Sequence, residues 1–565
     1  MTKIANASST RRPSLRRVRN AYDQDAEEKK LALIAAAEKA PPRTAAALMR
    51  LHEDLLFIAA FPGDLKSLRA ARAALAKTQV WVRRLPKAAR ARLDDSGVAG
   101  SASRHVFPYA IAKWIAARAR GEAEIDWRRI EESPAFDAVL RAIARRAEID
   151  AFECGNYDAR GWTALARPKD KRSDLQWIMD ESAAALTGAQ ADELWSMAEP
   201  PIAWRLQASK WSTTRNILPK APVVLRKSLR RPPPDPARRI AEPLSGIVRL
   251  GRRRAKEVID VARAALSARC REVVAISNPN PDEVYWCDLG EGVALAVIGV
   301  APSSRLSLET NTGYILISNG VPIGYGGVTP LYRQANTGIN IFDPFRGGEA
   351  SYLWVEMLRA FATIYGVKRF IVNGYQFGEG NTEAIASGAY WFYYRLGFRP
   401  DAAARRKRAA REAARLAKPN AERSDKATLK ALAQGDLVLD LPGFDARDAF
   451  PEAQLATVSA CASRALASAG ADRKSAAKAL GRGVAEKLGV VLDSLTPEER
   501  RAFTALAPIV SLAPDIGTWS GGEKEAVVGM MRAKGRRIER DFAQAAARNE
   551  RLFRLLARLR IAEAG

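Results

Sequence analysis

The sequence predicts an α+β protein in which a mixed, mostly antiparallel sheet with its own helices lies between two all-helical regions. Two changes of composition, at about residues 270 and 400, lead to this prediction. Outside these limits, alanine, leucine, arginine and glutamate recur at helical spacing. Between them, glycine and β-branched residues increase and alanine decreases, and short apolar runs bounded by turn residues predict strands.

The first 225 residues are expected to form two parts. Residues 1–20 are polar and basic and are predicted to be a flexible tail. Residues 21–225 are predicted to be all-helical, because apolar residues in segments such as 51–61 fall on one broad helical face. Proline, glycine and asparagine interrupt the pattern and divide it into several short helices.

A basic, proline-rich linker and helix are predicted for residues 226–269. The segment 230–236 contains four prolines. Proline cannot continue a helix, because it lacks the amide donor and collides with the preceding turn. An extended linker is therefore expected, followed by a basic helix over about 252–269.

The sheet region, residues 270–400, begins with strands. Apolar runs at 283–289 and 292–300 are separated by a glycine-containing turn. Two further runs, 314–317 and 321–328, are joined by Ser318-Asn319-Gly320. Asn-Gly tolerates positive φ at both turn positions, so this segment predicts a β-hairpin.

A strand, a short Arg-Gly-Gly loop and a long helix follow the hairpin. The strand is expected over 337–342, the helix from the loop to about Tyr365 with Gly366 ending it, and a further strand over 367–372. The first N–H groups of a helix have no intrahelical partner and lie at the positive end of its dipole. The loop and helix together therefore predict an anion pocket that suits a pyrophosphate. A plain turn before a helix is the alternative.

Residues 401–565 are predicted to be helical again. A basic helix begins with Arg405-Arg406-Lys407-Arg408 and ends near Pro419. Two capping boxes mark further helix starts. One runs from Thr496 to Glu499 with proline at the first helical position, and the other is Ser520-Gly521-Gly522-Glu523.

The order of elements between residues 270 and 400 resembles the GNAT acyltransferase family. The hairpin's second strand contains Ile323-Gly324-Tyr325-Gly326, and the last helix ends Tyr393-Tyr394-Arg395-Leu396-Gly397-Phe398, which is similar to the family's Tyr-x-x-Leu-Gly-Phe. The resemblance implies an enzyme that moves an acyl group, most simply acetyl, to an amine of an acceptor whose identity the sequence leaves open. Acetyl-CoA or another acyl-CoA would be the co-substrate.

The resemblance also implies roles for individual residues. Backbone amides near Ile341 and Phe342 would meet the thioester carbonyl, and the loop would bind the pyrophosphate. The loop residues are Arg346, Gly347, Gly348, Glu349 and Ala350. Tyr393 would protonate the leaving thiolate, with Tyr394 as the second choice. Glu309 and Asp343 are the candidates for the general base.

The loop departs from the family pattern. If Arg346 is its first residue, the loop is one residue shorter than the family's loop. If Gly348 is instead aligned with the family's glycine, Asp343 stands where the family has arginine or glutamine. Glu349 adds a carboxylate near the expected phosphates, which would repel an anionic ligand. Asn381 lies upstream of the position where the family has asparagine, which indicates an insertion around 378–387.

Positive charge is concentrated outside the sheet region. The chain has a net charge of +27, whereas residues 281–400 hold eight Lys/Arg and ten Asp/Glu. The excess is compatible with a polyanionic partner such as nucleic acid, bound by the basic helices at 225–269 and 402–418, and equally with basic helix faces that are only solvated. A second hypothesis is therefore a catalytically silent GNAT-like scaffold whose basic helices bind nucleic acid or a partner protein. A third is a helical interaction platform.

The small number of histidines and cysteines and the lack of long apolar runs argue against metalloproteins, membrane-spanning proteins and secreted proteins. The chain has only two histidines and four scattered cysteines, so no metal site is expected. No apolar run approaches the ~20 residues that span a bilayer, and residues 1–40 lack the apolar segment of a signal peptide. The sequence therefore predicts a cytoplasmic protein without a membrane span.

Overall fold

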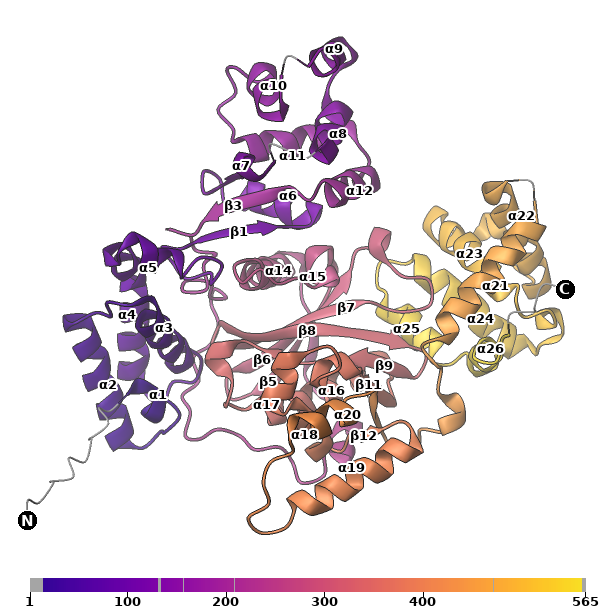
Figure 1. The fold of residues 1–565 in the computed structure, drawn as a ribbon. Coiled ribbons are helices and arrows are strands. Elements are labelled where there is room, and N and C mark those ends of the chain that lie inside the picture. The colour runs from indigo at the N-terminus through magenta and orange to yellow at the C-terminus, as the bar shows by residue number, and fades with distance from the viewer. Residues whose placement is uncertain (1–13, 131–133, 156, 208, 471, 561–565) are drawn as a thin grey trace, which may run out of the picture.

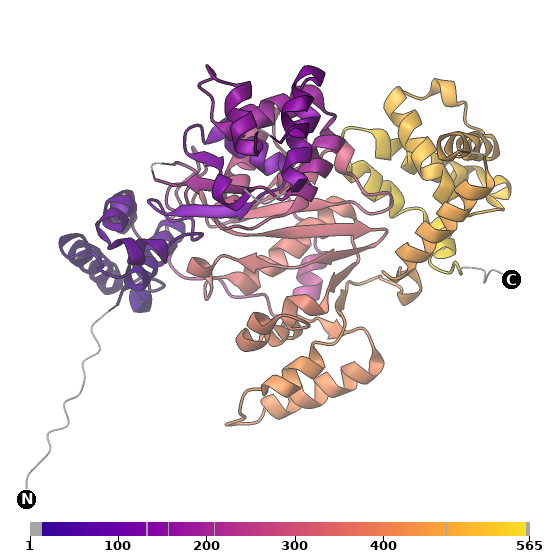
Figure 2. The same cartoon turned by 45° about the horizontal axis from the view of Figure 1, so that its top comes forward.

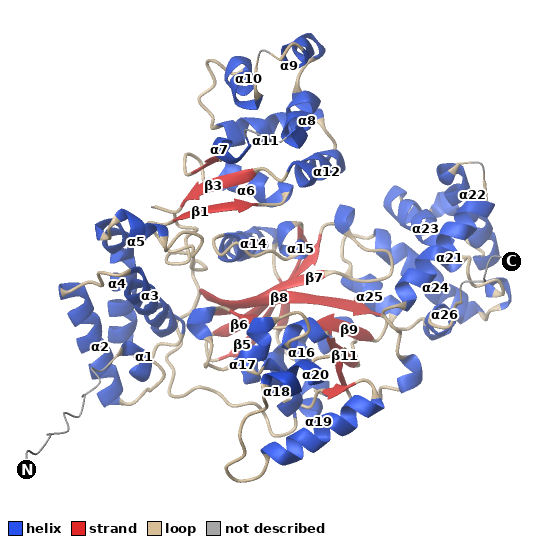
Figure 3. Cartoon of the chain, viewed as in Figure 1, coloured by secondary structure: helices blue, strands red, loops and turns tan. Residues whose placement is uncertain are grey.

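A central ten-stranded sheet with helices on both faces forms the middle of the molecule (Figures 1 and 3). The computed structural model describes residues 14–130, 134–155, 157–207, 209–470 and 472–560. Helices of the N-terminal part lie at one end of the sheet, and helices of the C-terminal part lie at the other (Figure 1).

The sheet is mixed and mostly antiparallel, as the sequence predicts. Its order is β12-β13-β11-β9-β8-β7-β6-β5-β4, with β10 also beside β8, and only β9 and β11 run parallel. The strands are β4 (Ile247–Arg249), β5 (Pro279–Gly290), β6 (Val293–Val300), β7 (Thr312–Ser318), β8 (Val321–Leu331), β9 (Gln334–Thr337), β10 (Asn340–Ile341), β11 (Arg369–Val372), β12 (Arg399–Pro400) and β13 (Leu437–Asp440).

The predicted hairpin is β7 and β8. Asn319 and Gly320 form its turn with φ values of 48° and 84°, the backbone that only glycine and asparagine adopt readily. The Asn319 side chain also fastens the turn to the N-terminal part. Its Oδ1 accepts the N–H of Val224 at 2.7 Å, and its Nδ2 donates to the carbonyl of Ala60 at 2.9 Å.

Helices cover the two faces of the sheet. Tyr314 of β7 packs against Phe361 of α16 (Ala350–Tyr365) on one face, with ring centroids 5.5 Å apart. The neighbouring Gly313 faces Ile276 of α15 (Val274–Ser277), because side chains alternate along a strand. The helix α14 (Arg252–Ser267) lies beside α15 on this second face (Figure 1).

The N-terminal helices belong to the same hydrophobic core as the sheet. They are α1 (Leu15–Val18), α2 (Gln24–Lys39), α3 (Ala45–Ala60), α4 (Leu65–Arg84) and α5 (Lys87–Ala91). The prediction of a flexible tail over 1–20 is wrong for its last residues, because Leu15 is buried and Arg19 forms an ion pair with Asp54 at 2.9 Å. Residues 1–13 lie outside the described part of the chain.

A separate unit between residues 98 and 211 corrects the all-helical prediction for 21–225. It contains an antiparallel sheet of β1 (Ala102–Val106), β3 (Pro201–Arg205) and β2 (Ala123–Ile125), with its own tryptophan-rich core. These strands are short, and β3 pairs with partners far away in the chain, so no local pattern marks them. The helices are α6 (Tyr109–Arg118), α7 (Trp127–Ile130), α8 (Pro134–Ile143), α9 (Ile149–Glu153), α10 (Ala159–Ala166), α11 (Asp174–Ala185) and α12 (Gly188–Ala198).

Two short elements, one of them the edge strand of the central sheet, follow this unit in the sequence. In the predicted linker and helix, 226–269, a short helix α13 (Pro236–Ala241) and the strand β4 precede α14. Asp235 caps α13, and Pro236 takes its first position, where the missing N–H has no helical partner to lose.

The C-terminal part, 401–565, is not all-helical either. A hairpin of α19 (Ala403–Leu416) and α20 (Lys426–Leu432) extends beyond the sheet in Figure 2, and then β13 enters the sheet between β11 and β12. The last helices form their own core, and both predicted capping boxes are present. These helices are α21 (Gln454–Ser468), α22 (Arg473–Leu488), α23 (Pro497–Val510), α24 (Gly521–Gly535), α25 (Arg540–Ala546) and α26 (Glu550–Leu556).

A buried carboxylate joins the sheet to the C-terminal helices. Glu283 on β5 accepts the backbone N–H of Glu539 at 2.8 Å and that of Arg540 at 2.7 Å, where α25 begins. Burial raises the pKa of Glu283 from 4.5 to about 7, more than the two N–H donors lower it. The folded protein therefore holds this proton up to a higher pH than the unfolded chain does.

We expect this difference to make the stability depend on pH. Between about pH 4.5 and pH 7 the unfolded chain releases the proton first, so the free energy of unfolding falls as pH rises, by roughly 3 kcal/mol from this group. Urea denaturation at pH 5 and pH 8 measures the fall. Glu283→Gln is the control, because its stability relative to the parent should improve as pH rises. A constant difference between the two proteins would contradict the assignment.

Candidate active site

A cleft of about 1310 Å³ opens where two strands of the sheet separate. The parallel strands β9 and β11 pair as far as Asn336 and Ile371 and then diverge. The cleft lies along the open edge of β10, between the start of α16, the helices α17 (Thr382–Ser387) and α18 (Ala389–Arg395), and α3 from the N-terminal part.

The backbone between β9 and β10 leaves the ladder at the mouth of this cleft. Thr337 pairs with Val328 and Asn340 pairs with Tyr325, so the register is the same before and after the gap. Gly338 and Ile339 are therefore unpaired without any inserted residue. Two tyrosines lie against them: the Tyr314 hydroxyl donates to the carbonyl of Gly338, and the Ile339 amide lies close enough to the Tyr393 oxygen to lower the pKa of that hydroxyl.

The alternation of hydrogen bonds shows which amides face the cleft. Phe342 donates its N–H to Ile323 at 3.0 Å, so this pair is hydrogen-bonded and the next pair, Ile341 and Gly324, is not. The N–H of Ile341 consequently points away from β8, toward the opening that β11 has left. Of the two amides expected to meet a carbonyl, Ile341 is available and Phe342 is already occupied.

Gly326 makes the hydroxyl contacts sterically possible. A Cβ at this position would collide with the Tyr314 hydroxyl and lie 2.9 Å from the carbonyl oxygen of Gly338. The glycine of the Gly-Tyr-Gly segment in β8 therefore lets Tyr314 reach the interrupted backbone.

The structure brings Tyr393 to the cleft and not Tyr394. Tyr393 is 3% exposed and packs edge-on against Trp354 at 5.6 Å and Phe377 at 6.1 Å between ring centroids. Burial raises the pKa of its hydroxyl, so the phenol keeps its proton at neutral pH. Tyr394 is not among the residues lining the cleft and instead stacks with Tyr390 and the guanidinium of Arg399.

The two carboxylates expected as bases are separated. Glu309 is not among the residues lining the cleft. It lies beside α24, where its carbonyl accepts Lys534 Nζ at 3.0 Å. Asp343 lines the cleft but is 69% exposed and forms an ion pair with Arg346 at 3.0 Å. A third carboxylate, Glu53 on α3, lines the cleft in a less exposed position and forms an ion pair with Arg16 at 3.3 Å. Burial and the charge of Asp343 raise its pKa more than Arg16 lowers it.

The two charged side chains of the loop before α16, Arg346 and Glu349, have partners that the sequence did not predict. Arg346 is exposed and contacts both Asp343 and Glu383. The Glu349 carboxylate is fully buried and binds Arg226 and Arg230, with Arg230 Nη2 at 3.2 Å from Oε2. The expected repulsion of an anionic ligand does not arise, because two arginines neutralise Glu349 outside the cleft.

The predicted site residues are thus divided by the fold. Those that line the cleft are Ile341, Phe342, Asp343, Arg346, Ala350 and Tyr393. Those that are not among its lining residues are Glu309, Gly347, Gly348, Glu349 and Tyr394. Gly347, with a φ of 83°, belongs to the turn that leads into α16.

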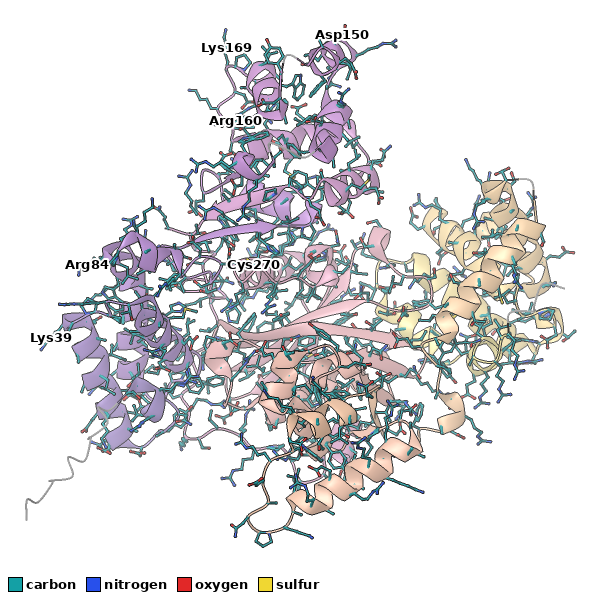
Figure 4. The ribbon with its side chains drawn as sticks, in the orientation of Figure 1. Lys39, Arg84, Asp150, Arg160, Lys169 and Cys270 are labelled. Atoms are coloured by element: carbon teal, nitrogen blue, oxygen red, sulfur yellow. The ribbon has the colours of Figure 1, made fainter. Side chains whose placement is uncertain are left out.

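Sequence reasoning missed residues that reach the cleft from outside the sheet region. His52 and Glu53 come from α3, and Arg269 follows α14. Figure 4 labels Cys270, the residue next to Arg269, whose Sγ lies 3.2 Å from Ser103 Oγ on β1. Arg269 and Arg271, the two basic residues that flank Cys270, are a sequence signal that could have indicated an anion-binding wall. Nothing local in α3 indicates that it packs against this sheet.

Comparison with known proteins assigns the cleft to no family. Neither family models, nor curated protein sequences, nor solved structures gave a match to the chain. Among the described residues, no cluster of three or more histidine, cysteine, aspartate or glutamate side chains could hold a metal ion. In the same part of the chain, each helix is too short or too polar to cross a bilayer.

Proposed function

We propose that the protein is a GNAT-like acyltransferase whose cleft binds an acyl-CoA and transfers the acyl group, most simply acetyl, to an amine. One observation carries the proposal: Ile341, whose N–H points away from β8, and Tyr393 line the same cleft where the sheet opens. An oxyanion needs a backbone donor and a leaving thiolate needs an acid, and these two groups supply them within one cleft.

The reaction can be written with the groups of this chain. The amine nitrogen attacks the thioester carbon. The carbonyl oxygen, which becomes negative, accepts a hydrogen bond from the N–H of Ile341. The carbon–sulfur bond then breaks, and the thiolate takes the proton of Tyr393. Tyr393 lines the cleft, and burial raises the pKa of its hydroxyl, so the phenol carries the proton that the thiolate takes. Glu53 accepts the proton that the amine loses, and its raised pKa suits a general base.

Isothermal titration calorimetry with acetyl-CoA and longer acyl-CoAs tests the proposal. Binding with a Kd in the micromolar range would support it, and the chain length that binds best would indicate the acyl donor. Absence of binding at millimolar acyl-CoA would overturn it.

Arg346→Ala is expected to weaken acetyl-CoA binding about tenfold, because a charge-assisted hydrogen bond to phosphate is lost. Glu383→Gln provides the matched control, since it removes a competing carboxylate from Arg346 and should leave binding unchanged or tighter. Calorimetry measures both. Equal affinity of Arg346→Ala and the parent would move the pyrophosphate site away from this loop.

The α19–α20 hairpin favours a second candidate function, a silent scaffold that binds nucleic acid. Within α19, all of which the structure describes, only Ala409 is buried, and four basic residues are exposed: Arg406, Lys407, Arg408 and Arg411. RNA or DNA binding that weakens steeply with salt, together with no affinity for acyl-CoA, would favour this function over the enzyme.

A further inference from the structure

Arg269 is a partly buried cation in the wall of the cleft. It follows the C-terminus of α14, where its Nη1 donates to the carbonyl of Ala265 at 2.9 Å. Its guanidinium lies over the ring of Phe342, 4.0 Å from the ring centroid, and Phe342 in turn stacks with Tyr325. The guanidinium is therefore held in a fixed plane beside the strand that borders the opening.

No carboxylate of the described residues lies within ion-pair distance of this guanidinium, although the charge of Asp343 acts on it from farther away and raises its pKa. Arg269 forms no ion pair with any residue that the structure describes, whereas the buried arginines Arg19 and Arg226 each bind a carboxylate. Burial lowers the pKa of Arg269 to about 10, which still leaves it charged at neutral pH. A partly buried charge without an ion-pair partner is costly, and a guanidinium has five N–H donors, of which Ala265 takes one. The geometry therefore leaves donors for an anion that enters the cleft.

Arg269 and Tyr393 approach the opening from opposite faces of the sheet. Tyr325 and Gly326 are neighbours on β8, so they face opposite sides. Arg269 lies on the side of Tyr325, through Phe342, whereas the Tyr314 hydroxyl beside Gly326 reaches the backbone that Tyr393 also contacts. A ligand bound to Arg269 therefore approaches the reacting carbon from the side opposite the tyrosine that meets the thiol.

We propose that Arg269 binds a carboxylate of the acceptor, so that the amine substrate is an amino acid or another amine that carries a carboxylate. This inference rests on the proposed acyltransferase function. A planar guanidinium matches a carboxylate with two parallel hydrogen bonds. The neighbouring His52 is buried and its pKa is lowered to about 3, so it stays neutral beside Arg269. Glu53 on the same wall is placed to meet the amine end.

The test compares amines that differ only in the carboxylate. With acetyl-CoA as donor, thiol release is measured for γ-aminobutyrate against n-butylamine and for glycine against methylamine. We expect kcat/KM to be at least about tenfold higher for the carboxylate-bearing amine in at least one of the two pairs. Arg269→Met should abolish that preference through the KM of the acceptor and leave the Kd of acetyl-CoA unchanged.

Stability and a matched variant separate this role from a structural one. Arg269→Met should melt at the same temperature as the parent or higher, because no carboxylate is left without its partner. Arg253→Met, an exposed arginine on α14, removes the same charge and should keep the carboxylate preference. Arg269→Lys should restore only part of it, since an ammonium lacks the planar fork.

The outcomes distinguish this inference from the proposed function. Acetyl-CoA binding with no carboxylate preference, or with a preference that Arg269→Met retains, would overturn the role of Arg269 and leave the enzyme. Absence of acyl-CoA binding would overturn the enzyme. In that case direct binding of γ-aminobutyrate, measured by saturation-transfer NMR against n-butylamine, still decides: binding lost in Arg269→Met supports a carboxylate site, and no binding overturns it.

Discussion

Tyr393→Phe is expected to lower the turnover of acetyl-CoA roughly 10²–10⁴-fold, the usual contribution of a positioned general acid. The change removes one hydroxyl and keeps the ring that packs against Trp354 and Phe377. Without the phenol, the thiolate has no proton donor at the point where the sheet opens. The Ile339 amide also loses the oxygen beside it, but it borders the cleft, where water can replace the hydroxyl.

Steady-state thiol release and calorimetry together test this expectation. The Kd for acetyl-CoA should stay close to that of the parent, because the tyrosine acts on the leaving group and not on the bound nucleotide. Tyr394→Phe is the matched control on the same helix, and its turnover should be nearly normal. Full activity of Tyr393→Phe would remove it as the acid, and loss of activity in both variants would indicate damage to α18 as a whole.

Glu349→Ala is expected to lower the free energy of unfolding by about 3–5 kcal/mol, the usual cost of breaking a buried ion pair from one side. Arg226 is fully buried and Arg230 is 17% exposed, so both charges would be left with much less compensation. Carbonyl oxygens of Glu291 and Leu289 still accept from these arginines at 2.7 Å each, which limits the loss.

Urea denaturation measures the effect of Glu349→Ala. Glu383→Ala is the control, since Glu383 is a 69% exposed carboxylate near the same loop and its surface ion pair contributes less than about 1 kcal/mol. Similar stabilities of the two variants would mean that Arg226 and Arg230 are satisfied without Glu349. A large loss confined to Glu349→Ala would identify this carboxylate as the anchor of residues 226–230.

The ion pairs of Glu349 give the loop before α16 contacts that the GNAT resemblance does not predict. A carboxylate at Glu349 is unfavourable in a loop judged only by its expected phosphate ligand. In this chain the carboxylate binds two arginines of the segment that precedes α13, and Arg226 also donates its N–H to the carbonyl of Pro62. The residue therefore serves contacts with a part of the chain more than a hundred residues away, which no loop motif describes.

Local signals predicted the central elements well. Asn319-Gly320 fixes its turn through two positive φ values, and Gly366, with a φ of 74°, ends α16 as expected. Thr496 and Ser520 begin α23 and α24 through their capping boxes. Each of these features depends on the backbone preference or hydrogen bonding of neighbouring residues, which is information that a short stretch of sequence contains.

Contacts between distant segments could not be predicted in this way. β13 has four residues, and only its partners β11 and β12 make it a strand. His52 and Glu53 lie within the helical pattern of α3, which does not set them apart from the other residues of that helix. They reach the cleft because Phe61, at the end of α3, packs against Phe345, which follows the interrupted strand. Their position depends on tertiary packing, which the periodicity of the sequence does not predict.

The position of β13 sets the order in which the protein can be completed during synthesis. β11 and β12 precede it in the chain, yet β13 lies between them and pairs with both. Until residues 437–440 have been made, β11 has an open edge with unpaired backbone groups, which is a template for pairing with another chain. A fragment that stops at residue 400 would keep this edge permanently, whereas one that continues past Asp440 brings the strand that closes it.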